Sequence, residues 1–186
     1  MSLSTITKSA TAELDEKGSR FIGHLVPWTR FDNSLATLRV EHRKASHHVI
    51  AFRHMLPDNR IEEGARDDGE PAGTSGMPAL KVLIGADLVD ADIIIVRYFG
   101  GTKLGTGGLA RAYAGTALRT IETATLVPWH RIASRTISCP FENMSSLEQR
   151  ISAAGVTVLN RDYTDTGVTI VIEGPEKAIA SIATEN

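Results

Sequence analysis

The stretch that decides the fold is Arg97–Tyr113, which reads RYFGGTKLGTGGLARAY. The aliphatic run Ile93–Val96 precedes it, and apolar residues such as Leu109 and Ala117 follow it at helical spacing. The predicted order is therefore a buried strand, a glycine-rich loop and the start of a helix. That order places backbone N–H groups at the positive end of a helix, where anions bind readily. Because residues 93–121 carry basic but no acidic side chains, a phosphate-bearing partner is the first hypothesis.

The glycine spacing argues against the common nucleotide-binding motifs. Gly100 and Gly105 have the separation of a phosphate-binding loop, but Thr106 and Gly107 follow where that loop needs Lys and then Ser or Thr. In the dinucleotide fingerprint the third glycine position is Ala110 here, and no acidic residue stands about 20 residues on to hold a ribose. Two interpretations stay open, namely functional anion contact and purely structural glycines.

The composition is that of an ordinary globular protein. The chain has 186 residues, of which 42% are hydrophobic and 23% charged, and this length suits one large or two small domains. A formal net charge of −2 does not mark a general nucleic-acid binder, so any basic surface must be local. Cys139 is the one cysteine, and the sequence shows no leader-like or bilayer-spanning apolar run. We expect a cytoplasmic protein that does not associate with membranes.

The part of the chain before residue 128 predicts alternating strands and helices. Strands are expected at Phe21–Trp28, Ser46–His54, Arg60–Ala65 and Ile93–Val96, and helices at residues 33–44, 77–84 and from the glycine loop to about 125. Residues 1–18 show scattered apolar positions without a clear period. Asp67–Pro78 reads DDGEPAGTSGMP, an irregular loop in which Thr74 or Ser75 can cap the following helix. It is the second glycine-rich entry into a helix.

A domain boundary is expected at Val127–Trp129, which divides the chain into residues 1–128 and 130–186. The second part predicts a strand at 132–141, a helix at 145–154, strands at 156–163 and 168–173 and a helix at 176–184. This β-α-β-β-α order is ferredoxin-like without its closing strand. The sheet of this part is therefore incomplete, or a partner finishes it.

Two long segments together resemble the signature of the IMPACT family, in its bacterial YigZ-like branch. They are DDGEPAGTSGMPAL (Asp67–Leu80) and VRYFGGTKLGTGGLARAY (Val96–Tyr113), and the likeness covers about residues 18–125. The resemblance implies an α+β protein of two domains. The first would resemble the second domain of a ribosomal small-subunit protein, with a four-stranded sheet and helices on one face. Residues 130–186 are similar to the ferredoxin-like domain that bacterial members append, itself similar to a late domain of translation elongation factor G.

The resemblance also implies a link to translation. Eukaryotic relatives restrain the activation of a kinase that acts on an initiation factor, and RNA or ribosome binding is proposed for bacterial members by analogy of fold. Two positions depart from the family pattern. His47–Val49 stands where the family has a His-x-Cys-type segment, which removes thiol chemistry there, and Ser75–Gly76 replaces Ala-Gly.

The candidate phosphate or nucleic-acid contacts lie in the two glycine-rich loops. Side chains would supply charge and stacking, and loop amides would supply direct hydrogen bonds. The residues are Arg97, Tyr98, Gly100, Gly101, Lys103, Gly105, Gly107, Gly108 and Arg111 in one loop, and Thr74, Ser75 and Gly76 in the other.

The acidic group Asp67, Asp68 and Glu70 has two interpretations. Paired carboxylates can bind a divalent metal or act as general bases, whereas loop carboxylates more often bind their own backbone. We favour the second, in which Asp68 or Glu70 organises the loop and ties it to Arg97 or Lys103. His47 is a candidate acid or base, with a structural histidine as the alternative. No metal site and no cofactor are expected.

Three functions follow from these observations. The leading hypothesis is a non-enzymatic, translation-associated regulatory protein that binds RNA, the ribosome or another phosphate-bearing partner through both glycine-rich loops. The first alternative is an enzyme acting on a small phosphorylated or nucleotide ligand, with Asp68, Glu70 and His47 as acid/base candidates. The second is a protein-interaction module, with a partner in translation control. The leading hypothesis requires the two loops to meet in space and to present unpaired amides and cations.

Overall fold

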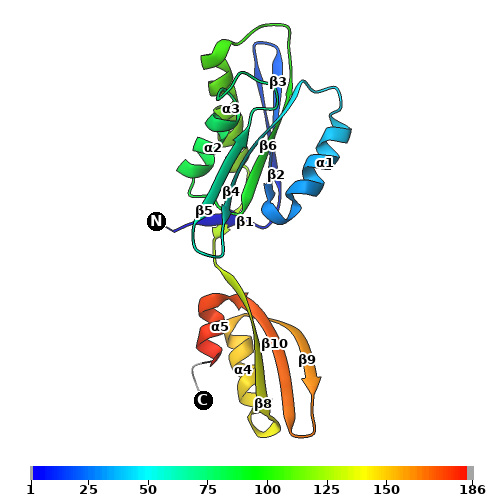
Figure 1. Ribbon diagram of the computed structural model, residues 1–186, viewed down its shortest axis with the longest axis vertical. Helices are drawn as coiled ribbons and strands as arrows, with labels where there is room; N and C mark the ends of the chain where they lie inside the picture. The colour runs from blue at the N-terminus through cyan, green and yellow to red at the C-terminus, as the bar shows by residue number, and fades with distance from the viewer. Residues whose placement is uncertain (1, 184–186) are drawn as a thin grey trace. The chain divides into compact units, whose positions relative to one another are not determined.

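The computed structural model describes residues 2–183 and divides the chain into two compact units, 1–129 and 130–186 (Figure 1). Residues 1 and 186, the outer limits of the two expected domains, lie outside the described residues. Each unit combines helices with an antiparallel sheet. The expected two-domain α+β class is therefore confirmed.

The first unit is built on a sheet of five antiparallel strands among the described residues, in the order β2-β3-β6-β4-β5. The strands are β2 (Ala10–Glu16), β3 (Ser19–Pro27), β4 (His47–Met55), β5 (Ile61–Arg66) and β6 (Ala91–Tyr98). The central strand β6 is aliphatic and buried on both faces as far as Arg97. A separate short pair joins β1 (Ser4–Ile6) to β7 (Leu126–Pro128). The glycine-rich loop thus leaves the middle of the sheet.

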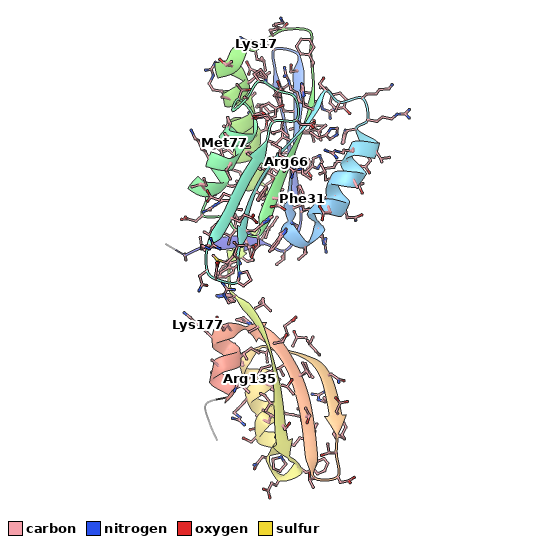
Figure 2. The ribbon with its side chains drawn as sticks, in the orientation of Figure 1. Lys17, Phe31, Arg66, Met77, Arg135 and Lys177 are labelled. Atoms are coloured by element: carbon pink, nitrogen blue, oxygen red, sulfur yellow. The ribbon has the colours of Figure 1, made fainter. Side chains whose placement is uncertain are left out.

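Helices cover both faces of this sheet (Figures 1 and 2). On one face, α2 (Gly76–Gly85) and α3 (Gly105–Glu122) pack over Ile93 and Ile95 in the main core. On the other, the 3-10 turn η1 (Trp28–Arg30) leads into α1 (Phe31–Glu41), whose Leu38 packs on Val26 and Ile94. Because Ile94 alternates with its neighbours along β6, it points to the α1 face.

Two details of the first domain differ from the expectation of four strands with helices on one face. The additional strand is β2, whose residues alternate between half-buried and exposed at the sheet edge. Its half-buried positions are Ala10, Ala12 and Leu14, whose mostly small side chains give a weak hydrophobic signal, so residues 1–18 show no clear period in the sequence. Helix α1 lies on the face opposite to α2 and α3. There its Leu38 packs against Val26 of β3 and Ile94 of β6 in a small apolar cluster.

The second unit has the expected β-α-β-β-α order. Its elements are β8 (Ile132–Pro140), the 3-10 turn η2 (Phe141–Asn143), α4 (Met144–Ala154), β9 (Thr157–Tyr163), β10 (Gly167–Pro175) and α5 (Glu176–Ala183). The strands pair antiparallel in the order β8-β10-β9. Leu147 and Ile151 of α4 pack with Ile170 and Ile172 of β10 in a core of their own. No helix within residues 2–183 has both the length and the apolar character to cross a bilayer.

Two histidines lie on the α1 face of the first unit, His24 half-buried and His48 buried. The ring of His24 lies 6.1 Å from that of His42, and His24 Nε2 has no hydrogen-bond partner within the described residues. Burial, with a smaller contribution from the charge of His42, lowers the pKa of His24. Burial also lowers the pKa of His48, outweighing the opposing effects of a nearby carbonyl and of Asp68. The charged form of both rings is thus disfavoured under α1.

This burial predicts a pH-dependent stability. The unfolded chain, with histidine pKa values near about 6.5, takes up protons before the folded chain does. The free energy of unfolding should therefore fall as the pH drops through about 6.5, and level off below the folded-state pKa values. Denaturant unfolding from mildly alkaline to mildly acidic pH measures this slope. The double variant His24→Leu/His48→Leu should flatten it, whereas His130→Leu, at an exposed position, should not. An unchanged slope in the double variant would contradict the assignment.

Candidate functional site

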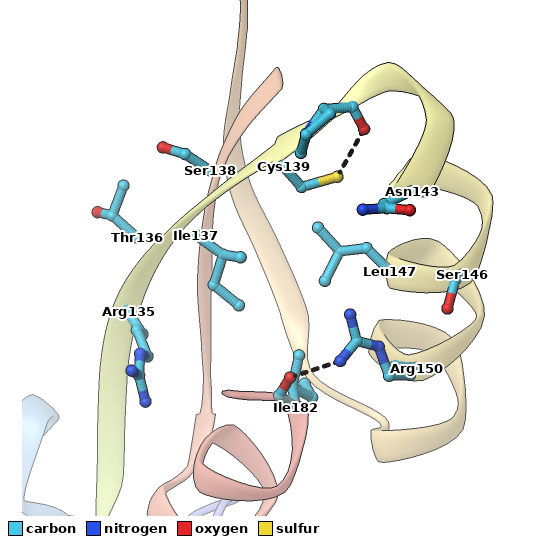
Figure 3. A pocket seen from close by; sticks show the side chains of 11 residues that line it. Arg135, Thr136, Ile137, Ser138, Cys139, Asn143, Ser146, Leu147, Arg150 and Ile182 are labelled. Carbon is cyan, nitrogen blue, oxygen red and sulfur yellow. Dashed lines mark hydrogen bonds between the residues drawn. The ribbon is translucent and has the colours of Figure 1, made fainter. Parts of the chain in front are cut away.

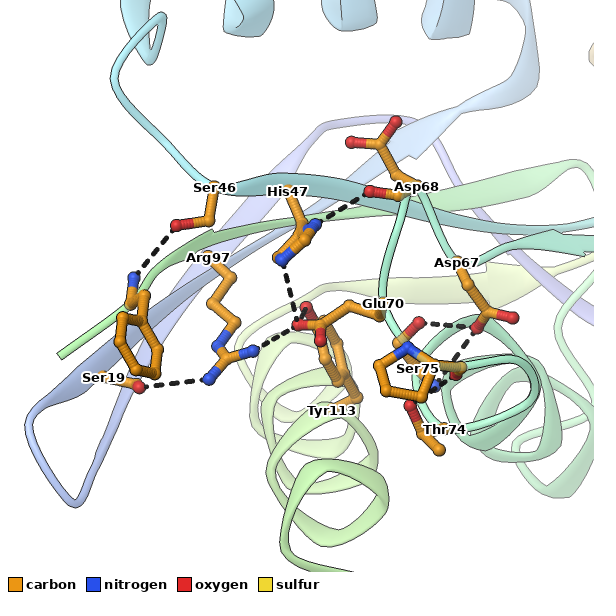
Figure 4. A network of polar contacts seen from close by, with 12 residues as sticks. Ser19, Ser46, His47, Asp67, Asp68, Glu70, Thr74, Ser75, Arg97 and Tyr113 are labelled. Atoms are coloured by element: carbon orange, nitrogen blue, oxygen red, sulfur yellow. Dashed lines mark hydrogen bonds and ion pairs between the residues drawn. The ribbon is translucent and has the colours of Figure 1, made fainter. Parts of the chain in front are cut away.

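A buried carboxylate joins the two signature segments (Figure 4). Glu70 Oε1 accepts hydrogen bonds from Arg97 Nη1 of β6 at 2.5 Å and from the Tyr113 hydroxyl of α3 at 2.7 Å. Arg97 Nη2 also donates to Ser19 Oγ at 3.3 Å. The interpretation that an acidic residue of the first loop forms a salt bridge with Arg97 is confirmed. The loop, the central strand and α3 are held together at one point.

Arg97 is consequently not a contact for an outside partner. Its side chain is 6% exposed, and its guanidinium packs 5.4 Å from the ring centre of Phe21 and 5.6 Å from that of Phe99. The expectation that Arg97 supplies charge to a phosphate is wrong, because the buried Glu70 already neutralises it. Arg97 shares the face of Ile93 and Ile95, which packs into the core.

Tyr113 is a fixed hydrogen-bond donor. Burial raises the pKa of its hydroxyl, and the bond to Glu70 and the charge of Glu70 raise it further. The phenol therefore keeps its proton across the physiological range. In this arrangement it holds Glu70 in place and does not act as an acid or base.

Asp67 caps the amino end of α2 from within the first loop. Its carboxylate accepts four hydrogen bonds at 2.6–3.2 Å, from Ser75 Oγ and from the amides of Gly73, Ser75 and Gly76. Burial alone would raise the pKa of Asp67, but these hydrogen bonds, led by the one from Ser75 Oγ, outweigh it and lower the pKa. The carboxylate stays charged and satisfies the helix start.

The expectation that Thr74–Gly76 presents unpaired amides is therefore wrong. The amides of Ser75 and Gly76 are bound by Asp67, and the Thr74 amide donates to the Pro71 carbonyl at 3.0 Å. Ser75 stands at the N-cap position as predicted, but its hydroxyl donates to Asp67 and does not itself cap the helix. An anion at this helix start would have to displace the chain's own carboxylate.

Asp68 fastens the same loop to β4. Its carboxylate accepts the His48 amide at 2.6 Å, and its carbonyl accepts His47 Nδ1 at 2.8 Å. Because a carbonyl only accepts, Nδ1 of His47 carries the hydrogen, and Nε2 faces Glu70 Oε1 at 3.8 Å. The role of His47 as an acid or base stays a prediction. Among the described residues, no cluster of three or more His, Cys, Asp or Glu side chains is arranged to hold a metal ion.

The second loop uses some of its glycines for the fold. A side chain at Gly100 would meet the Gly18 backbone at 1.8 Å, and Gly101 and Gly105 have φ values of 84° and 70°. Gly107 differs from these. Its φ is not positive, and the nearest atom to an added Cβ is the flexible Arg111 Nη1 at 3.5 Å. The fold therefore does not explain a glycine at this position, and the bare backbone there faces outward.

The start of α3 is open to a ligand. The structure shows no side-chain cap at Leu104, and the first turn, Gly105–Gly108, contains no acidic residue. Lys103 and Arg111 beside it are exposed. The first turn of a helix leaves its amides without intrahelical partners. Of the predicted contacts, the structure brings together Lys103, Gly105, Gly107, Gly108 and Arg111 at this open helix start.

A groove of about 300 Å³ continues this surface between the end of β2 and α3. The basic residues Lys17, Arg111 and Arg119 line it, together with the acidic Glu16. The contribution of Lys17 was missed by sequence reasoning, because the β2–β3 turn reaches α3 only in the folded sheet. Tyr98, in contrast, points to the α1 face, where its hydroxyl lies 2.9 Å from His42 Nδ1.

Comparison with known proteins places the chain in a family. The model of the Impact N-terminal domain matches residues 17–121. The chain belongs to the IMPACT family. It is 36% identical to IMPACT family member YigZ of Escherichia coli K12 over 153 residues, which cover 79% of this chain and 74% of that protein. It is 33% identical to an IMPACT family member of Haemophilus influenzae over 190 residues, 97% of this chain and 89% of that protein. The expected YigZ-like relationship is confirmed.

A solved structure is similar to nearly the whole chain. It is the crystal structure of a hypothetical protein, and the match has 29% sequence identity and a TM-score of 0.71. The match covers 99% of this chain and 90% of the other chain. The Impact N-terminal domain match runs from the β2–β3 turn to the last residues of α3. It thus contains both glycine-rich loops and the Glu70 network.

The buried ion pair predicts a large cost for removing one partner. Glu70→Gln leaves the Arg97 charge buried without its counter-ion, and this should lower the free energy of unfolding by about 3–5 kcal/mol. Denaturant unfolding measures the change. Glu13→Gln is the control, since the Arg20–Glu13 pair is about half exposed on both sides and should contribute little. Equal effects of the two variants would show that Glu70 does not hold the loops together.

The two kinds of glycine in the second loop predict opposite effects of alanine. Gly100→Ala must push apart two backbone segments, and it should destabilise the protein by about 1–3 kcal/mol. Gly107→Ala meets open space in a helix, and it should be neutral or stabilise the protein by up to about 1 kcal/mol. Thermal and denaturant unfolding compare the two. A destabilising Gly107→Ala would mean that the fold itself requires this glycine.

Proposed function

We propose that this IMPACT family protein is a non-enzymatic, translation-associated regulator whose first unit binds the phosphates of RNA, free or in the ribosome, at the start of α3. The observation that carries the proposal is the uncapped helix start flanked by Lys103 and Arg111. The link to translation comes from the family resemblance. The second glycine-rich loop, which leads into α3, makes the contact. The first loop, which leads into α2, supports it structurally.

The electrostatics of this surface suit a phosphate backbone. Open amides and the positive end of the helix dipole attract anions. Exposed cations surround them, namely Lys17, Lys103, Arg111 and Arg119. Such cations supply most of the sequence-independent affinity for nucleic acid. The bare backbone at Gly107 lets a phosphate approach closely. Acidic Glu16 limits the surface on one side.

The enzyme alternative receives less support from the same geometry. Of its acid/base candidates, Glu70 is bound by Arg97 and Tyr113, and Asp68 is bound by the His48 amide. A general base needs a basic atom within reach of a substrate proton. Here the carboxylates are occupied by groups of the chain itself, which favours binding over catalysis.

Charge reversal at the helix start tests the proposal. Lys103→Glu/Arg111→Glu should abolish retention of a short single-stranded RNA at low salt and reduce the salt dependence of binding by about two phosphate contacts. Filter binding and co-sedimentation with ribosomes across a salt series measure both quantities. The control Lys44→Glu/Lys81→Glu changes the net charge equally at exposed positions that lie outside the second loop and do not line the groove beside α3. Unchanged retention by the Lys103/Arg111 variant would reject the proposal.

A second variant separates binding from general charge effects. Gly107→Gln fills the bare position without altering charge, so it should weaken RNA retention while the protein stays folded. Thermal shifts with nucleotides and Mg²⁺ examine the enzyme alternative in the same preparation. Stabilisation by a nucleotide but not by RNA would favour that alternative. A pull-down that yields a single protein partner and no RNA would favour the protein-interaction module.

A further inference from the structure

Phe99 is a half-exposed aromatic residue at the entrance to the second glycine-rich loop. It directly follows β6, its exposed fraction is 50%, and α3 begins at Gly105 a short way further along the chain. A single exposed apolar residue is common on protein surfaces and needs no function by itself. The case for a function depends on how the ring is held and on what lies beside it.

The structure holds the Phe99 backbone and one side of its ring in place. The Phe99 amide donates to Ser46 Oγ at 3.3 Å, and the next residue, Gly100, packs closely against the backbone of Gly18. The guanidinium of Arg97 lies 5.6 Å from the centre of the Phe99 ring. Within residues 2–183 no other aromatic ring stacks on Phe99. The ring is therefore positioned by a buried cation while half of the residue faces solvent.

Phe99 emerges on the same side of the sheet as the start of α3. Along β6, Ile93, Ile95 and Arg97 point to the face that α2 and α3 cover. Phe99 continues this alternation and contacts Arg97, whereas Tyr98 points to the α1 face. The chain from Phe99 to the start of α3 spans at most about 20 Å even when fully extended. A strand of a few nucleotides can therefore reach from the ring to the amides of α3.

Two other surfaces do not add an aromatic ring to this contact. Trp28 is also about half exposed, but its amide donates to the carbonyl of Asp90, which precedes β6, so it lies at the other end of that strand. A groove of about 530 Å³ in the second unit has no aromatic side chain among the described residues that line it (Figure 3). Phe99 is thus the ring that accompanies the exposed cations at the start of α3.

We propose that Phe99 stacks on an unpaired base of an RNA strand whose phosphates lie at the start of α3, so that the protein selects single-stranded over duplex RNA. Every base has a π-face, so such stacking tolerates any sequence. The bases of a single strand are free to leave their neighbours and stack on an aromatic side chain, whereas those of a duplex are not. This inference rests on the function proposed above and adds the form of the RNA to it.

An RNA strand without bases isolates the stacking contact. Such an abasic strand keeps the ribose and phosphate groups of a short single-stranded RNA but offers no ring. In filter binding at low salt, the full-length protein should hold the base-bearing strand about tenfold more tightly than the abasic one. It should also hold that strand more tightly than the same strand annealed to its complement.

Substitution of the ring completes the cycle. Phe99→Leu keeps an apolar cover over Arg97 but removes the aromatic face, so it should weaken binding of the base-bearing strand by about tenfold and leave binding of the abasic strand unchanged. Phe99→Trp should keep the preference for bases. Phe141→Leu is the matched control, since Phe141 of the second unit is 49% exposed, and it should bind both strands as the unaltered protein does.

The outcomes separate this inference from the proposed function. Equal weakening of both strands by Phe99→Leu would show that the ring only positions the loop, and unchanged binding of both would show that it contacts no base. Equal binding of single-stranded and duplex RNA by the unaltered protein would also overturn the inference. In each case, loss of binding in Lys103→Glu/Arg111→Glu would leave the phosphate contact standing. Failure of the unaltered protein to retain either strand would overturn both proposals.

Discussion

The first unit depends on the burial of one carboxylate. A charge removed from water is tolerated only where other groups neutralise and hydrogen-bond it. Glu70 meets this requirement by taking Arg97 from the central strand and Tyr113 from α3. The loop before α2, the sheet and the long helix are therefore fixed relative to one another. The glycine-rich segments need no common ligand to come together, because the protein supplies the contact itself.

This constraint divides the charged residues of the signature into two groups. Asp67, Asp68 and Glu70 bind groups of the chain itself, namely helix amides, the β4 backbone and Arg97. Lys103 and Arg111 are left outside at the open start of α3. The first loop thus has a structural role. The second loop has two roles, because Gly100 packs against the backbone of Gly18 and Gly107 is open to an outside partner. Because the acidic side chains are bound within the chain and the basic ones are not, a nearly neutral chain has a locally positive surface.

Much of the fold and part of the candidate site could be predicted from the sequence. The predictions that were wrong failed for physical reasons. The strand–loop–helix order around β6 and the β-α-β-β-α tail follow from strong periodicity. Strand β2 does not, since its half-buried positions hold two alanines and one leucine, which give a weak hydrophobic signal. The inward direction of Arg97 was available from its parity with Ile93 and Ile95, and a tyrosine on the buried face of α3 needs a hydrogen-bond partner. The occupancy of the Thr74–Gly76 amides depends on a long-range turn that no local pattern specifies.

The proposed contact at the start of α3 depends on charge and not on base sequence. Cations and an uncapped helix start recognise an anion of any sequence, and such binding weakens as salt rises because counter-ions compete. The Arg97–Glu70 pair beneath it is buried, so salt screens that pair far less. Raising the ionic strength should therefore release RNA from this surface while the network that supports it stays intact. Salt thus separates the binding role of the second loop from the structural role of the first.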